Sequence, residues 1–316
     1  MTGGVRPATY FRLNHKTGDL IMELLEYYAR QSPITDPGEF GEMFADLPRD
    51  ITELCQVAQS LIIHYMDGEK LFNCAIPKER LPEVDTRYVT RMLARIKELD
   101  DRPLTEARSP EKRLIGCCRD FATLFCAMTR YLEIPARVRI GFGAYYIPEF
   151  NQDHAIVECW DNNEKCWRLI DPEISDRHMA EYSITFNPHD VPRDQFILGG
   201  QAWQMCRSGQ INADKFGVDP KSEFRGWSAI QHKLIQDLAA QNKIELLLWD
   251  VCGLMGRSPS EEELDLLDKV AVLTQAGNEA FSEMQAIYEN EPSLKVPPVI
   301  MSYSPASAPS EVMLGI

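Results

Sequence analysis

A thiol, an imidazole and a carboxylate follow one another within a single stretch of this chain. They are Cys118, His154 and Asp171. These three groups, in this order, are the parts of a nucleophilic triad. Because the chain has nine cysteines, such an order also arises by chance, and the neighbouring Cys117 is a second candidate for the nucleophile.

Cys118 lies where a helix is expected to begin. After it, apolar residues recur at the three- and four-residue spacing of a buried helix face, and Ile134-Pro135 ends the pattern. The first turn of a helix carries partial positive charge and free N–H groups. A thiol in that position is expected to ionise more easily, and the nearby amides can receive an oxyanion.

His154 and Asp171 belong to a predicted hairpin. Polar and apolar residues alternate along residues 137–142 and 154–160, which is a strand pattern. Residues 161–165 form a polar turn, and residues 166–170 return as the partner strand of a hairpin. If the last two strands pair across that turn, His154 and Asp171 lie at the same end of adjacent strands. The imidazole would then be within reach of the carboxylate.

These residues resemble the transglutaminase-like superfamily of papain-like cysteine enzymes, which also includes the peptide:N-glycanases. The resemblance covers roughly residues 80–170. It implies an α+β fold in which Cys118 is the nucleophile, His154 the base and Asp171 the group that orients the base. Four motifs carry it in the family's order: Gly116-x-Cys118-Arg119-Asp120-Phe121-Ala122, the run from Arg130 to Val138, His154-Ala155-x-Val157-Glu158, and Trp167-x-Leu169-Ile170-Asp171-Pro172.

Structural and metal-binding roles of cysteine and histidine are less favoured by the sequence than the triad. A cysteine in a buried helix is most often a small apolar residue, and this is the interpretation of Cys126. The chain has no Cys-x-x-Cys pair, so a zinc site is not predicted, and no acidic loop resembles a calcium site. We therefore expect no metal and no cofactor. Five other histidines are interpreted as structural or surface groups: His15, His64, His178, His189 and His232.

Composition limits the class of protein. The formal net charge of −15 argues against nucleic-acid binding, which needs clustered Lys and Arg. The amino terminus has no apolar core of a signal peptide, and nowhere do enough apolar residues follow one another to span a membrane. An odd number of cysteines without a framework spacing fits a reducing compartment. The expected location is the cytoplasm, and the resemblance points to a bacterial protein.

Outside the motifs, the pattern is mainly helical. Helices are predicted over residues 50–65 with Asp50 as N-cap, 85–99, 228–241, 244–255, and from the capping box at Ser260 to about residue 290. Residues 175–200 have little periodicity and are predicted to be a long ordered loop beside the site.

The predicted architecture is a transglutaminase-like core with added helices at both ends. An antiparallel sheet holding His154 and Asp171 packs on the helix that begins at Cys118. Residues 1–79 would be a helical lead-in, 80–200 the catalytic core and 201–291 a helical extension. Residues 292–316, rich in Pro, Ser and Ala, would be a flexible tail.

The resemblance implies an enzyme that attacks a carboxamide, peptide or thioester carbonyl through an acyl-enzyme. The leading interpretation is acyl transfer to an amine, which makes an amide bond, with a carrier-protein thioester of natural-product biosynthesis as one donor. The alternative is a peptidase or amidase that uses water. A third interpretation is a non-catalytic interaction module. The expected partners are an acyl donor and, for a transferase, an amine acceptor, with neither nucleic acid nor membrane.

Overall fold

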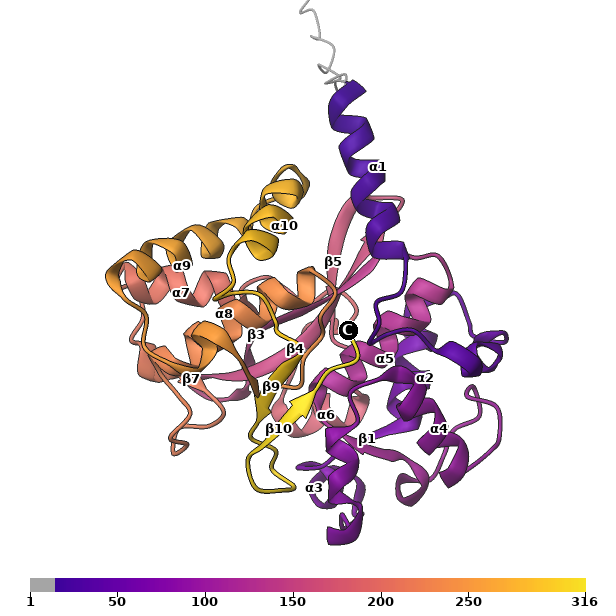
Figure 1. Ribbon diagram of the computed structural model, residues 1–316. Coiled ribbons are helices and arrows are strands. Elements are labelled where there is room, and N and C mark those ends of the chain that lie inside the picture. The colour runs from indigo at the N-terminus through magenta and orange to yellow at the C-terminus, as the bar shows by residue number, and fades with distance from the viewer. Residues whose placement is uncertain (1–14) are drawn as a thin grey trace, which may run out of the picture.

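A mixed sheet of five strands lies at the centre of the computed structural model, which describes residues 15–316 (Figure 1). Four strands follow the antiparallel order β5-β4-β3-β6, and β7 pairs in parallel with β4. The strands predicted at residues 137–142, 154–160 and 166–170 are confirmed. Their bounds are β3 (Ala136–Ile147), β4 (Phe150–Asp161), β5 (Cys166–Ile170), β6 (Phe196–Leu198) and β7 (Phe216–Gly217).

One face of the sheet packs against the helix α5 (Cys118–Tyr131), of which residues 118–130 are all buried. The apolar residues of α5 share a core with α2 (Ile51–Leu61), α4 (Val89–Leu99) and the strands β3 and β4. Asp50 caps α2, since its side chain accepts a hydrogen bond from the Glu53 N–H. The other amino-terminal helices are α1 (His15–Ala29), α3 (Gly68–Phe72) and the 3-10 turns η1 (Gly38–Phe44), η2 (Lys78–Asp85) and η3 (Pro110–Lys112).

The predicted helix over residues 50–65 is too long. It ends at Leu61, and the chain continues as β1 (Ile62–His64), which pairs in parallel with β2 (Leu114–Gly116). Ile62 and Ile63 are buried and β-branched, and such residues pack well in strands. The register places His64 beside Gly116, directly before the two cysteines.

The opposite face of the sheet is covered from the carboxyl-terminal part of the chain. Figure 1 shows α8 and its neighbours, in salmon to orange, on the other side of the sheet from α5. The predicted helix 228–241 is confirmed as α8, which is buried along nearly its whole length. The helices of this part are α7 (Gly199–Arg207), α8 (Trp227–Gln241), α9 (Glu261–Leu273), α10 (Phe281–Asn290) and the 3-10 turns η4 (Ala213–Lys215), η5 (Gly253–Gly256) and η6 (Asn278–Ala280).

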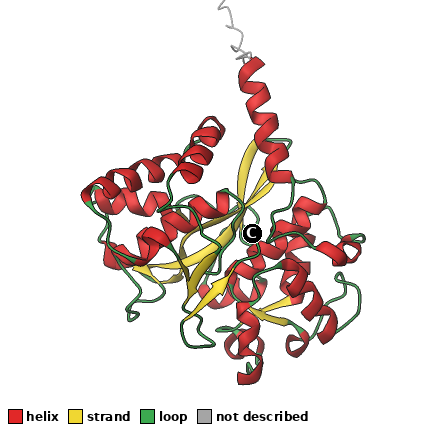
Figure 2. Cartoon of the chain, viewed as in Figure 1, coloured by secondary structure: helices red, strands yellow, loops and turns green. Residues whose placement is uncertain are grey.

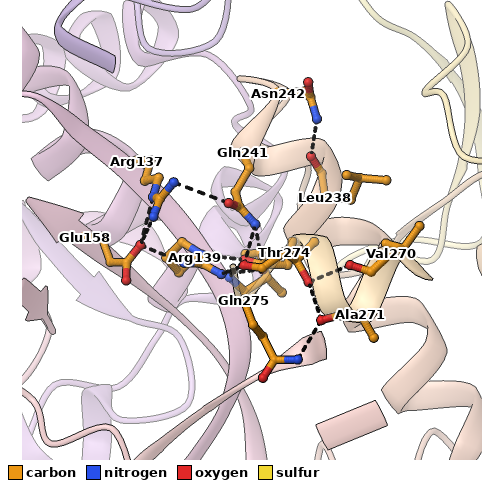
Figure 3. A network of polar contacts seen from close by, with 12 residues as sticks. Arg137, Arg139, Glu158, Leu238, Gln241, Asn242, Val270, Ala271, Thr274 and Gln275 are labelled. Carbon is orange, nitrogen blue, oxygen red and sulfur yellow. Dashed lines mark hydrogen bonds and ion pairs between the residues drawn. The ribbon is translucent and has the colours of Figure 1, made fainter. Parts of the chain in front are cut away.

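A buried polar network joins α8 to the sheet (Figure 3). Arg139 on β3 donates to Glu158 on β4 at 2.6 Å, to Asp237 on α8 at 3.0 and 2.8 Å, and to the Thr274 carbonyl after α9 at 2.8 Å. Gln241 donates to Asp237 at 3.1 Å. The core and the carboxyl-terminal extension therefore share buried ion pairs, while the boundaries between units stay a prediction.

Three helical or irregular segments differ from prediction. Residues 175–200 contain α6 (Asp176–Tyr182), capped by Ser175, and the strand β6. Residues 244–255 form no α-helix but a turn, the strand β8 and the start of η5: the Asp250 carboxylate accepts from the Leu247 N–H in the turn, and Gly253 adopts φ +48°. The capping box at Ser260 is confirmed, but its helix ends at Leu273, and a separate helix, α10, begins after Gly277.

The flexible tail predicted for residues 292–316 is wrong. This segment adds two strands to a second antiparallel sheet, seen in yellow near the carboxyl terminus in Figure 2. Ile300 and Leu314 are buried in the core of the carboxyl-terminal part, so these apolar residues outweigh the Pro- and Ser-rich composition. The strands are β8 (Asp250–Val251), β9 (Val299–Ser302) and β10 (Ser310–Met313).

Candidate active site

The segment before α5 holds the candidate nucleophile rigidly. Cys117 is the extended N-cap residue, and Cys118 is the first residue of the helix. The Cys117 N–H donates to the Asp120 carboxylate at 2.8 Å, and Arg119 donates to the other oxygen of Asp120 at 3.1 Å. A side chain at Gly116 would meet that carboxylate at 2.8 Å, which explains glycine there. The predicted position of Cys118 in the first turn is confirmed.

His154 and Asp171 meet as the hairpin register predicts. Strands β4 and β5 pair Val157 with Ile170, so Asp171 follows the end of β5 beside His154 on β4. His154 Nε2 lies 2.7 Å from Asp171 Oδ2. The Tyr145 hydroxyl donates to the same oxygen at 2.7 Å, and the Glu173 N–H donates to the other carboxylate oxygen at 3.1 Å.

These contacts set the ionisation of Asp171. Burial alone would raise the pKa of this carboxyl, but His154 and the hydrogen bonds from His154, Tyr145 and the Glu173 N–H lower it overall. Asp171 is therefore ionised at neutral pH. An ionised carboxylate facing Nε2 favours the tautomer that has its proton on Nε2 and a lone pair on Nδ1.

The thiol comes close to this pair. Cys118 Sγ, a ring nitrogen of His154 and a carboxylate oxygen of Glu173 all lie within 4.8 Å of one another. Because Nε2 contacts Asp171, Nδ1 is the ring nitrogen left to exchange a proton with the thiol. The three residues singled out in the sequence are thus brought together in one place.

The electrostatics of Cys118 differ from the prediction. The hydrogen bond with Cys117, burial, and the charges of Cys117, Glu173 and Asp153 raise the pKa of Cys118 well above its ordinary value. The helix amino terminus does not outweigh these effects. Few Cys118 thiols would therefore ionise on their own at neutral pH, so a nucleophilic role of Cys118 would need a neighbouring base.

Glu173 is a site residue that the sequence prediction missed. Its side chain is buried, and burial, with added repulsion from Asp171 and Asp67, raises the pKa of its carboxyl well above the usual value. The signal was its position two residues after Asp171. Four of the five other histidines also lie closer to the site than predicted, since they line cavities beside it: His64, His178, His189 and His232.

A cavity of about 820 Å³ opens over Cys118 and His154. Its nearer wall includes Tyr65, Met66 and Tyr146. Its far wall comes from the carboxyl-terminal part of the chain, for which the sequence suggested no role. Aromatic and apolar side chains dominate that wall: Val218, Phe224, Trp227, Leu248, Trp249, Val251, Met255, Tyr303 and Pro305.

The segment 175–200 contributes little to this cavity, with Tyr182 as its contact. Residues 175–179 and 185–189 line a second cavity of about 730 Å³, which shares His64 and Glu173 with the first. Cys126 and Cys159 are buried, whereas Cys166 is exposed. Among the helices of residues 15–316, none is both long and apolar enough to cross a lipid bilayer.

Comparison with known proteins relates the region that contains the site to a known superfamily. Residues 84–172, which contain all three candidate residues, match the model of the transglutaminase-like superfamily. No curated protein matches the chain. One similar solved structure is a Cytophaga hutchinsonii protein provisionally assigned as a cysteine protease. It is 16% identical, with a TM-score of 0.29, and the match covers 58% of this chain and 46% of that chain.

Proposed function

Because residues 84–172 match the model of the transglutaminase-like superfamily, we propose that this protein is a cysteine enzyme that transfers an acyl group to an amine. The carrying observation is that His154 contacts Asp171 at 2.7 Å and has a ring nitrogen within 4.8 Å of the Cys118 thiol. This arrangement can supply a nucleophile, a base and an orienting carboxylate.

The proposed first half-reaction forms an acyl-enzyme. The Cys118 proton moves to His154 Nδ1 as sulfur attacks the donor carbonyl. Amide N–H groups at the start of α5 face the developing oxyanion. When the intermediate collapses, the bond to the leaving group breaks, and His154 returns the proton to that group. Asp171 stays ionised and stabilises the imidazolium formed in between.

The second half-reaction regenerates the thiol. An amine attacks the thioester, His154 accepts its proton, and collapse releases the amide while Cys118 takes the proton back. Water in place of the amine would give a carboxylic acid. The aromatic and apolar wall of the large cavity favours the amine, because a bound apolar donor would exclude water from the thioester.

The acyl donor is proposed by chemical class only. A carboxamide, a peptide or a thioester suits the mechanism, and a carrier-protein thioester is the donor proposed from the resemblance. The strong negative charge of the chain would repel an acidic carrier, so such a carrier would need a local basic contact. Hydrolysis and a purely binding role are the competing outcomes of the experiment.

The deciding experiment offers small acyl thioesters with aromatic or aliphatic chains, with and without added primary amines. Mass spectrometry of the intact protein should detect an acyl adduct on Cys118, and product analysis should show amide replacing acid as amine increases. Cys118→Ala should form neither adduct nor product, whereas Cys166→Ala, at an exposed cysteine, should behave as the wild type. If the carboxylic acid were the sole product at every amine concentration, the protein would be a hydrolase. If no acyl adduct formed on Cys118, the proposal of catalysis through this cysteine would be wrong.

A further inference from the structure

Four polar side chains meet beside the candidate active site without completing one another's hydrogen bonds. His178 Nε2 lies 3.8 Å from Asp67 Oδ2 and 4.0 Å from Glu173 Oε1. His64 Nδ1 lies 3.8 Å from the same Asp67 oxygen. One possible ligand atom each from His64, Asp67 and Glu173 falls within 4.8 Å of the other two. These separations are too long for hydrogen bonds.

His178 supplies an independent sign that a ligand belongs here. The residue is 2% exposed, and its Nε2 has no hydrogen-bond partner within residues 15–316. Its other nitrogen can carry the ring proton, since Nδ1 lies 2.8 Å from the Ser175 hydroxyl and can donate to it in place of accepting the 3.3 Å hydrogen bond from the Ser175 N–H, which leaves the Nε2 lone pair free for a ligand. A buried ring nitrogen left without a partner is costly unless something unseen binds it.

The cluster also lacks a fixed positive charge. In the described part of the chain, the ion-pair contacts of Asp67 and Glu173 involve only these two histidines. Two imidazoles beside two carboxyls, with no Lys or Arg of residues 15–316 among their ion-pair contacts, form a donor set for a cation.

We propose that His64, Asp67, Glu173 and His178 bind one divalent transition-metal ion, with Zn²⁺ as the best fit. Zinc bonds of about 2.0 to 2.2 Å in a tetrahedron separate neighbouring ligand atoms by roughly 3.4 Å. The three separations of 3.8 to 4.0 Å would contract by about 0.4 to 0.6 Å to reach that value, and the ligand atoms of His64, Asp67 and Glu173 now lie within 4.8 Å of one another. Two imidazole ligands favour zinc and similar metals over Mg²⁺ and Ca²⁺, which prefer oxygen.

The proposed metal site joins several segments of the fold and is reached from the cavities. His64 ends β1, Asp67 precedes α3, Glu173 follows β5 and His178 lies on α6, so one ion would tie four segments together. His64 and Glu173 line both cavities, which gives the ion access. Binding through His64 Nδ1 would displace the long hydrogen bond from the Met66 N–H, now 3.2 Å.

Zinc titration of the chelator-stripped, full-length protein tests this site. Calorimetry should show one ion bound per chain, and the melting temperature should rise with zinc. Asp67→Asn and His178→Gln should each weaken binding by at least about 100-fold, since even residues that only support a ligand cost about 10- to 100-fold. His189→Ala is the matched control, because His189 lines the second cavity outside the cluster and contacts Thr52.

Cys118→Ala separates this site from its neighbour, because Cys118, His154 and Glu173 are also close enough to share an ion. The proposal requires Cys118→Ala to bind zinc as the wild type does, and it does not depend on the catalytic proposal. Zinc binding that is lost in Cys118→Ala but kept in folded Asp67→Asn and His178→Gln would overturn it. Failure of the wild-type protein to bind zinc would also overturn the proposal.

Discussion

Asp171 Oδ2 accepts two hydrogen bonds, one from His154 and one from the Tyr145 hydroxyl. This shared oxygen holds the imidazole, and under the proposed mechanism the imidazole must take the proton of Cys118, because the surroundings of the thiol raise its pKa. The chemistry of each of the three groups therefore depends on the next. A substitution of either His154 or Asp171 should therefore change the reactivity of the Cys118 sulfur.

Alkylation should identify the nucleophile. Iodoacetamide at near-neutral pH should label Cys118 before Cys117, because only Cys118 lies with His154 in the cluster of close ligand atoms. Peptide mapping by mass spectrometry gives the site. Cys118→Ala should lose labelling and turnover, and retained turnover in that variant with loss in Cys117→Ala would contradict the assignment.

The Asp171 contact should matter much more than the Tyr145 contact. Asp171→Asn permits the wrong imidazole tautomer, and in serine triads such a change costs about 10⁴-fold in rate, an upper limit for a cysteine enzyme. Tyr145→Phe removes one donor to an ionised carboxylate and should cost roughly 10- to 150-fold, since a hydrogen bond to a charged group contributes about 1.5 to 3 kcal/mol. Steady-state kinetics with a thioester donor compares them. Equal rates in wild type and Asp171→Asn would contradict the triad.

At the scale of elements, β3 and β4 carry their own buried ion pairs. Glu158 on β4 binds Arg137 and Arg139 on β3 through one oxygen, at 2.8 and 2.6 Å, and Arg193 through the other at 3.1 Å. Burial alone would raise the pKa of Glu158, but the three guanidinium groups lower it far below the usual range. The hairpin that carries His154 is thus tied to its surroundings by an ionised carboxylate.

Glu158→Gln should destabilise the protein by about 3 to 5 kcal/mol at pH 7, the usual cost of leaving a buried charge without its partner. Since the folded pKa lies below the unfolded value, the contribution of Glu158 is complete above that ordinary value. It is lost as the pH falls toward the folded pKa. The difference in unfolding free energy between wild type and variant should therefore shrink in acid.

Urea denaturation at a series of pH values measures this difference. Glu164→Gln is the control, because Glu164 is exposed in the turn of the same sheet. A gap between wild type and Glu158→Gln that stays constant down to strongly acidic pH would show that the charge of Glu158 is not its source.

The whole molecule builds the cavity from both ends of the chain. The thiol and imidazole come from the family-matched region and its strands, whereas the far wall comes from residues after 216. Arg87 binds Asp250 at 2.7 Å and Ser302 at 2.9 Å, so the amino-terminal part also holds the final sheet. Substrate selection should accordingly depend on residues outside the family motifs.

Trp227→Ala tests the far wall. Trp227 lines the cavity and keeps an exposed face, so its loss should raise KM for an apolar donor by about tenfold or more, as the burial of a large side chain suggests. Alkylation of Cys118 should be unchanged. Val272→Ala, at an exposed residue that does not line the cavity, is the control. An unaltered KM in folded Trp227→Ala would remove this wall from substrate binding.

Removal of residues 299–316 should lower stability. It deletes β9 and β10 and the buried side chains of Ile300 and Leu314, each worth about 1.5 to 3 kcal/mol when fully buried. Thermal melting of the truncated chain measures the loss. An unchanged melting temperature would support the flexible tail that the composition suggested.

The sequence alone was enough for the parts of the site that depend on local order. The periodicity after Cys118 predicted α5, and the alternation around a polar turn predicted the hairpin that joins His154 to Asp171. Capping at Asp50 and Ser260 was also predicted correctly. Each of these features rests on interactions between residues near in the chain, so the pattern carries the information.

Features that depend on contacts between segments distant in the sequence could be determined only from the tertiary structure. Residues 299–302 form a strand because they pair with β8, and the pKa of Glu173 is raised because this residue is buried beside Asp171 and Asp67. The raised pKa of Cys118, the aromatic far wall and the cluster of His64, Asp67, Glu173 and His178 have the same origin. Burial and packing between remote segments create these properties, and no local pattern records which segments will meet.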